Sequence, residues 1–194
     1  MTFMRGIAFA ALLSALPFAH ATDHNKIDQN SPTSTSTVAR FDQGGLAQSF
    51  KQSADNITGA GLFLSTPFGE ETQVTIELWT KLPNLGGSRL ATASAKGQAG
   101  SWVDVFWPKV MLDQGATYYL VFNGTPGFVG VLGDLTDPYA DGQLYANSGF
   151  DPQFTWMDFT FRTFAEAQAV PEPAAWSVML GGLALLAGIA RRRA

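Results

Sequence analysis

Short runs in which apolar and polar residues alternate dominate the middle of the chain, between residues 39 and 166. Around Val74, Ile76 and Leu78 the intervening residues are polar, and residues 102–107 also alternate. A period of two places alternate side chains on opposite faces of a β-strand. The runs of this kind are Leu46–Lys51, Ile57–Leu64, Gln73–Leu78, Arg89–Lys96, Trp102–Trp107, Thr117–Asn123, Phe128–Leu132, Gly142–Ala146 and Met157–Phe164.

Clusters of Gly, Pro, Asn and Asp separate these runs, and no long stretch between them has the period of an amphipathic helix. About nine short strands at this spacing are typical of two packed antiparallel sheets. The sequence therefore predicts an all-β domain over residues 39–166, an antiparallel β-sandwich with less than about a tenth of its residues in helices.

The spacing of Leu112, Gly115 and Tyr118 resembles a tyrosine corner, in which a Tyr at the start of a strand bonds back to the preceding turn. The alternation then directs Tyr118, Leu120 and Phe122 into the core. This motif favours a sandwich over a barrel. The alternative is an ordinary entry into a hairpin.

The first 21 residues contain one cation, Arg5, then an apolar run from Gly6 to Phe18, then Ala19 and Ala21 in an A-x-A pattern. This order is typical of a secretory signal peptide, with cleavage after Ala21. A short buried helix is the alternative. Residues 22–38 are polar and rich in Ser and Thr, and such a composition predicts a flexible spacer.

An apolar run of 17 residues, 174–190, follows two prolines near the C-terminus. As a helix it would extend about 25 Å, close to the thickness of a bilayer's hydrocarbon core. Three arginines, residues 191–193, follow the run, and such a cluster predicts that this end of the helix lies on the cytoplasmic side of the membrane. The predicted sandwich would then lie on the outer side. The residues flanking the run are Val170, Pro171, Glu172 and Pro173 before it and Arg191, Arg192 and Arg193 after it.

This combination of a Pro-Glu-Pro motif, an apolar helix and a terminal arginine cluster resembles the PEP-CTERM family of sorting signals. The resemblance implies that an exosortase-type membrane protease recognises Pro171–Pro173 and cleaves nearby. The precursor would reside transiently in the inner membrane of a Gram-negative bacterium that makes exopolysaccharide, and the product would reach the cell surface or extracellular matrix. The alternative is a permanent anchor that is never cut.

The chain has no cysteine, and its two histidines, His20 and His24, lie in or beside the signal peptide. Histidine triads, thiol nucleophiles and thiolate zinc sites therefore lack their side chains in the predicted domain. No cofactor is expected. The net charge of −4 disfavours nucleic acid as a partner.

Carboxylates are the remaining candidates for chemistry. Asp104 and Asp158 would serve glycoside hydrolysis if their carboxyl groups lay about 5–10 Å apart. Asp134, Asp137 and Asp141 have a spacing that suggests calcium, although it differs from the EF-hand pattern, and a solvated acidic loop is the alternative.

Aromatic residues are concentrated in residues 133–156, beside carboxylates and amides. Aromatic faces next to polar groups suit a sugar, which makes Tyr139, Tyr145 and Trp156 candidate glycan-binding residues. The alternative is a loop whose rings hold it to the sandwich. The central domain also resembles the jelly-roll, carbohydrate-binding-like sandwiches of exported bacterial proteins.

These features together suggest a non-enzymatic protein of the cell surface or matrix that associates with extracellular polysaccharide. The alternatives are an extracellular glycan-processing enzyme that uses carboxylates and a structural matrix component without a discrete ligand.

Overall fold

Three antiparallel sheets make up the computed structural model, which describes residues 25–65, 71–125 and 129–166. The four-stranded sheet has the order β1 (Asn25–Ser31), β12 (Phe161–Glu166), β4 (Asn56–Phe63) and β7 (Trp102–Met111). The five-stranded sheet has the order β10 (Gln143–Tyr145), β3 (Leu46–Lys51), β8 (Thr117–Gly124), β5 (Glu71–Trp79) and β6 (Arg89–Gln98). The small sheet has the order β11 (Asp158–Phe159), β9 (Gly130–Asp134) and β2 (Ser36–Arg40), and the 3-10 turns are η1 (Phe41–Gln43) and η2 (Pro83–Leu85).

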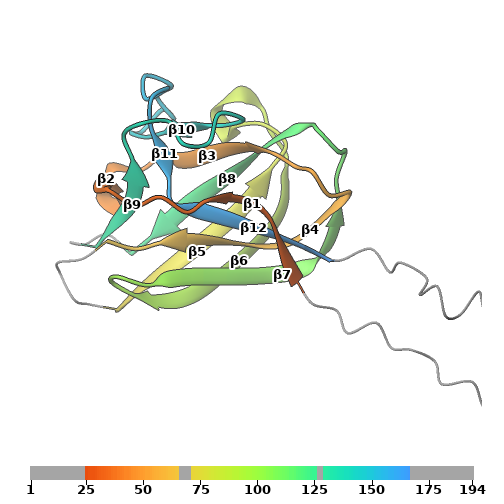
Figure 1. Ribbon diagram of the computed structural model, residues 1–194, viewed down its shortest axis with the longest axis horizontal. Helices are drawn as coiled ribbons and strands as arrows, with labels where there is room; N and C mark the ends of the chain where they lie inside the picture. The colour runs from red at the N-terminus through yellow and green to blue at the C-terminus, as the bar shows by residue number, and fades with distance from the viewer. Residues whose placement is uncertain (1–24, 66–70, 126–128, 167–194) are drawn as a thin grey trace, which may run out of the picture. The chain divides into compact units, whose positions relative to one another are not determined.

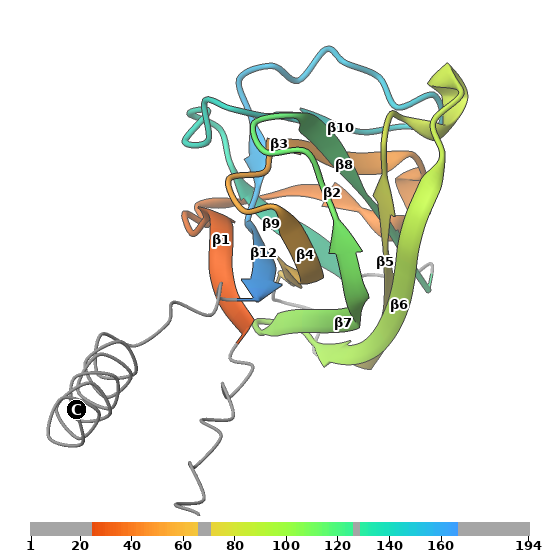
Figure 2. The ribbon, with the colours of Figure 1, turned by 90° about the vertical axis from the view of Figure 1, so that its right-hand side faces the viewer.

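The two larger sheets lie face to face (Figures 1 and 2). Their inward side chains form one hydrophobic core. Phe50 of β3 and Phe161 of β12 meet between the sheets, with ring centroids 6.5 Å apart. Phe122 of β8 lies edge-on to Phe159 of β11 at 5.4 Å, which joins the small sheet to the same core. The prediction of an all-β, sandwich-like fold is confirmed.

The alternating runs behave as the sequence predicts. Val74, Ile76 and Leu78 are fully buried, whereas the residues between them are partly exposed. Leu120 and Phe122 of β8 likewise point into the core. Every predicted run overlaps at least one strand in the described residues. Burial of one face keeps the register of β5 from slipping, whereas β3 and β4 are buried at almost every position.

The run predicted as one strand over Met157–Phe164 is two strands that belong to different sheets. Asp158 and Phe159 pair with β9, whereas Phe161 and the residues after it pair with β4 and β1. The change occurs at Thr160, whose N–H donates to the carbonyl of Leu132 over 2.9 Å. A continuous apolar run cannot reveal such a change of partner, because both strands bury their side chains.

The prediction of a flexible spacer over residues 22–38 is wrong where the structure describes it. Residues from Asn25 onward form β1, which pairs with β12, and β2 pairs with β9. Asp28 also accepts the N–H groups of Ser53 and Ala54, at 2.9 and 3.0 Å. These edge strands are held through backbone pairing and need few apolar side chains, so composition alone misjudged them.

The predicted tyrosine corner is confirmed. The hydroxyl of Tyr118, at the start of β8, accepts the N–H of Asp113 over 3.0 Å. Gly115 has a φ of +75°, and its N–H donates to the carbonyl of Gln52 over 2.7 Å, which ties the turn to the residue after β3. A side chain at Gly115 would be strained by that φ. The corner fixes where β8 enters the core.

Candidate functional site

The structure corrects the assignment of Tyr139 as a glycan-binding residue. Its side chain is only 9% exposed, and its ring lies edge-on to Phe161 at 5.1 Å. Its hydroxyl donates to Gln29 Oε1 over 2.8 Å and accepts the N–H of Lys51 over 3.2 Å. Burial raises the pKa of the Tyr139 phenol to about 12. The sequence signal was misleading here because a buried Tyr and a sugar-binding Tyr both pair an aromatic ring with a polar partner.

Tyr145 and Trp156, the other two predicted glycan-binding residues, lie in different settings. Tyr145 is on β10 and its ring is 6.0 Å from that of Tyr119. Trp156 is 52% exposed on the loop before β11, where its ring contacts Phe154 at 6.3 Å. The two residues have separate ring neighbours, so the predicted group of three aromatics does not form one site.

Tyr145 instead belongs to a row of rings on the outer side of the five-stranded sheet. Trp79 of β5 is directly opposite Tyr119 of β8, and Tyr119 faces Ser49 of β3. Tyr145 of β10 is opposite Ala47, the next outward position on β3. All three rings are partly exposed. We call Trp79, Tyr119 and Tyr145 the outer aromatic face.

A carboxylate orients one end of this face. Glu77 Oε2 accepts the indole N–H of Trp79 over 2.9 Å, and Glu77 Oε1 forms an ion pair with Arg89 at 2.6 Å. Such bonds fix the plane of the indole ring and place charged groups beside it. At the other end, burial, followed by the neighbouring Tyr119, raises the pKa of the Tyr145 phenol.

Two loops border the face. Leu82 and Phe150 pack in a small cluster with Ala47 and Val121, the outward residues between the rings. Asn84 Nδ2 donates to the carbonyl of Gly149 over 2.7 Å, which ties the loops together. Part of the ring surface therefore serves packing, as the alternative interpretation of the aromatic loop proposed. The remainder of the ring surface is partly exposed, with Glu77 and Arg89 at one end and the hydroxyl of Tyr145 at the other.

Sequence reasoning missed Trp79 and Tyr119 as candidate site residues. The signal was present, because Trp79 continues the outward series of Thr75 and Glu77 on β5. Tyr119 follows the inward-facing Tyr118, so alternation directs it outward. The strand order needed to bring these positions beside Tyr145 is long-range, and no local pattern contains it.

The two carboxylates proposed for glycan hydrolysis have unrelated partners. Asp104 of β7 forms a bidentate ion pair with Arg162 of β12 through Nε and Nη2. Asp158 is fully buried and accepts the side-chain amide of Gln48 over 2.7 Å and the N–H of Tyr139 over 2.9 Å. Burial raises the pKa of Asp158 to about 6. The two carboxyl groups share none of these partners, and both oxygens of Asp158 accept hydrogen bonds.

Two of the three aspartates considered for calcium have separate partners. Asp134 Oδ1 accepts the N–H and hydroxyl of Thr136, at 2.8 and 2.5 Å, and the hydroxyl bond contributes most to lowering its pKa. Asp141 forms an ion pair with Lys51 at 3.0 Å. Within the described residues, no three metal-binding side chains gather in one place.

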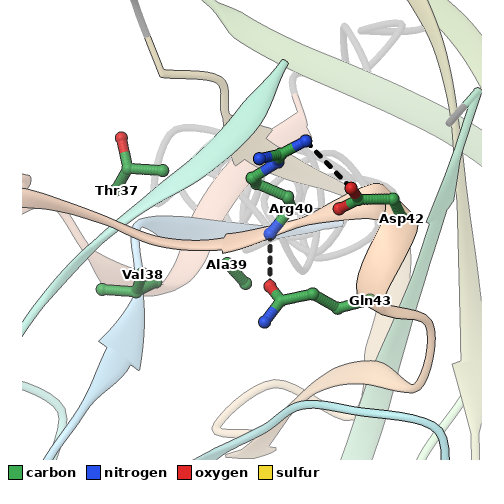
Figure 3. A pocket seen from close by; sticks show the side chains of 6 residues that line it. All are labelled: Thr37, Val38, Ala39, Arg40, Asp42 and Gln43. Atoms are coloured by element: carbon green, nitrogen blue, oxygen red, sulfur yellow. Dashed lines mark hydrogen bonds and ion pairs between the residues drawn. The ribbon is translucent and has the colours of Figure 1, made fainter. Parts of the chain in front are cut away.

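A hollow of about 370 Å³ lies beside the start of η1 (Figure 3). Its polar groups bond to each other: the Arg40 N–H donates to Gln43 Oε1 over 2.7 Å, and Arg40 Nη2 donates to Asp42 Oδ2 over 2.9 Å. These bonds close the turn, which explains the polar lining without a ligand. The residues around the hollow are Thr37, Val38, Ala39, Arg40, Asp42 and Gln43.

The predicted export and sorting residues lie outside the described parts of the chain. They are Ala19 and Ala21 at the signal cleavage site, residues 174–190 of the predicted membrane helix, and Val170, Pro171, Glu172, Pro173, Arg191, Arg192 and Arg193. In the three described stretches, no helix is long and apolar enough to cross a membrane.

The described fold defines the class as an all-β, sandwich-like protein with antiparallel sheets. Comparison with protein families identifies a sorting signal: residues 169–194 match the PEP-CTERM protein-sorting motif. This motif indicates exosortase-dependent sorting of an exported protein that is membrane-anchored before cleavage. No curated protein and no solved structure matches the chain.

Proposed function

We propose that this chain is a non-enzymatic protein of the cell surface or extracellular matrix that associates with exopolysaccharide through its outer aromatic face. The observation that carries the proposal is the row of Trp79, Tyr119 and Tyr145 across neighbouring strands, with Glu77 and Arg89 beside the indole. Sugar C–H faces stack on aromatic rings, and carboxylate and guanidinium groups bond to hydroxyls.

The sorting motif supports the location in this proposal. A signal peptide ending at Ala21 would export the chain, and cleavage near Pro171–Pro173 would free the sandwich for the surface or the matrix. The jelly-roll-like, carbohydrate-binding-like class also belongs to the proposal. It is supported by the path of the chain, which passes between the two larger sheets at β3–β4, β4–β5, β6–β7 and β7–β8.

Binding of the released protein to a glycan array and to the producing strain's own polysaccharide in affinity electrophoresis tests the proposal. Trp79→Ala and Tyr119→Ala should each weaken retention about tenfold, the loss expected when a stacked ring is removed. Trp156→Ala is the matched control, because this exposed tryptophan lies off the face. Thermal unfolding of each variant separates lost binding from lost folding.

Three other outcomes would contradict the proposal. Loss of binding with Trp156→Ala alone would place the contact on the loop before β11. New reducing ends in the retained polysaccharide would support the glycan-processing alternative. Absence of retention by wild-type protein on every glycan would leave a structural matrix component as the explanation.

A further inference from the structure

Apolar side chains are exposed at one end of the four-stranded sheet. This is the end where β1 begins and β12 ends. Ile27 on β1, Phe106 on β7 and Met111 at the end of β7 are 49%, 51% and 65% exposed. We call these three residues the apolar rim. Large apolar side chains at the surface are costly to leave in water, and a group of them points to an interaction surface.

The strand register brings the rim together. Ile27 is opposite Phe164, Phe164 is opposite Gly59, and Gly59 is opposite Phe106, so their outward positions form one row across the sheet. Met111 lies five residues further along β7, beyond an irregularity in the pairing, and is opposite Asn56, whose side chain accepts the N–H of Glu166 over 2.8 Å. The rim therefore borders the C-terminal end of β12, where Phe164 and Glu166 lie.

Phe106 is held in place by its neighbours. Its ring lies 5.1 Å from that of Phe164. A Cβ on Gly59 would come within 2.7 Å of the Phe106 ring. The absence of a side chain at Gly59 therefore leaves room for Phe106 over β4. A fixed ring loses little side-chain entropy when it binds a surface, which favours an interaction role.

Two ion pairs lie beside the rim, and Lys26 and Asp28, on either side of Ile27, carry opposite charges. Arg162 is bonded to Asp104, and its guanidinium carbon lies 4.1 Å from the centroid of Trp102. Lys109 forms an ion pair with Glu166. The surface around the rim is thus locally neutral in a chain with a net charge of −4, which disfavours anionic partners and suits an uncharged or zwitterionic surface.

The length of chain that follows β12 indicates which surface this is. Glu166, the last described residue, is opposite Asn25, the first. Seven residues, 167–173, separate Glu166 from the apolar run that begins at Ala174. Even fully extended, they limit the distance from the end of β12 to that run to about 28 Å. The sorting motif indicates that the precursor is anchored in a membrane through this run.

We propose that the apolar rim contacts the zwitterionic headgroup region of the bilayer while the precursor is anchored. In the headgroup region, apolar and aromatic side chains leave water without having to enter the hydrocarbon core. The tether keeps the sandwich at a high effective concentration near the surface, so a weak contact is sufficient. Cleavage removes the tether, and the rim alone then holds the protein too weakly to delay its release.

Because the chain has no cysteine, a single introduced cysteine can be labelled uniquely. Met111→Cys and Ile27→Cys report on the rim. Leu85→Cys is the matched control, since Leu85 is 65% exposed, like Met111, but lies on the η2 loop. Each full-length variant is labelled with a polarity-sensitive fluorophore and reconstituted into vesicles of phosphatidylcholine and phosphatidylethanolamine containing brominated lipid.

The expected result is several-fold stronger quenching of the label at positions 27 and 111 than at position 85. In the labelled form released from cells, which has lost its anchor, this difference should disappear. Equal quenching at all three positions, or none, would overturn the proposal. A spectral change that follows protein density but not brominated lipid would show that a second copy of the chain covers the rim, which would also overturn the proposal.

Failure of the full chain to enter vesicles would refute the anchored precursor and this contact together. Polysaccharide binding by the outer aromatic face would remain open to its own test.

Discussion

Gln48 and Asp158 are joined by a buried hydrogen bond of 2.7 Å from Gln48 Nε2 to Asp158 Oδ1. The other end of the same amide, Gln48 Oε1, accepts the N–H of Phe159 over 2.9 Å. Asp158 Oδ2 also accepts the N–H of Tyr139. One carboxyl group thus links β3 of the five-stranded sheet, the short β11 and the loop that carries Tyr139.

This arrangement makes the stability of the protein depend on pH. Burial, with the nearby charge of Asp137, raises the pKa of Asp158 from 3.8 to about 6, whereas the bonds from Tyr139 and Gln48 oppose that rise. A raised carboxyl pKa means that the folded state binds the proton more tightly than the unfolded state. The stabilisation is complete below about pH 4 and is lost as the pH rises through 6, by on the order of 3 kcal/mol.

Urea unfolding of wild-type and Asp158→Asn protein between pH 4 and pH 7 measures this effect. Asparagine does not titrate, so the variant should lose most of the decline in unfolding free energy over that range, although it is less stable overall. The exposed Asp113→Asn serves as control and should keep the wild-type slope. The same slope in all three proteins would show that Asp158 does not titrate in this range.

Removing the hydroxyl of Tyr118 should destabilise the sandwich by about 1 kcal/mol, because Tyr118→Phe leaves the N–H of Asp113 without its acceptor. Hydrogen exchange offers a local measurement. The Asp113 amide should be protected in wild type and exchange much faster in the variant, while amides in β5 change little. An Asp113 amide with unchanged protection would mean that the tyrosine corner contributes nothing to the turn.

Strands with strong alternation could be predicted from the sequence because burial of one face determines both their type and their register. The run Gln73–Leu78, for example, lies within β5, whose burial alternates along its length. Pairing partners could not be predicted, since they join residues far apart in the chain. For this reason the sequence did not predict the edge strands β1 and β2. It also did not predict that the chain changes from one sheet to another at Thr160.

The candidate site followed the same division. Tyr145 was identified from composition, but Trp79 and Tyr119 become its neighbours only through the order of β5, β8, β3 and β10. Tyr139 was misassigned because its partners, Gln29 and Lys51, lie on distant strands. The sorting motif needed no such information, because its parts are contiguous in the sequence.

Leu120 is fully buried between the sheets, so truncating it tests the shared core. Leu120→Ala should lower the free energy of unfolding by about 2–5 kcal/mol, the range for large-to-small changes in well-packed interiors. Chemical denaturation with circular dichroism measures the change. Leu85→Ala, at an exposed position, should have little effect. Equal, small losses in both variants would contradict a core that spans the two sheets.

The sorting motif leads to a prediction that is independent of the sandwich. Pro171 and Pro173 flank Glu172, and proline disfavours helix in the residue before it, so the peptide around Glu172 should stay accessible to a protease. Glu172→Ala should leave the thermal unfolding of the sandwich unchanged but block release, so that uncut protein accumulates in the membrane fraction. Deleting Arg191–Arg193 should also reduce release, because these cations hold the short span in place during sorting. The measurements are the fraction of protein outside the cell and the mass of its C-terminus, in a strain that contains an exosortase. If Glu172→Ala protein is released with the wild-type C-terminus, the Pro-Glu-Pro motif does not direct cleavage, and the tail acts only as an anchor.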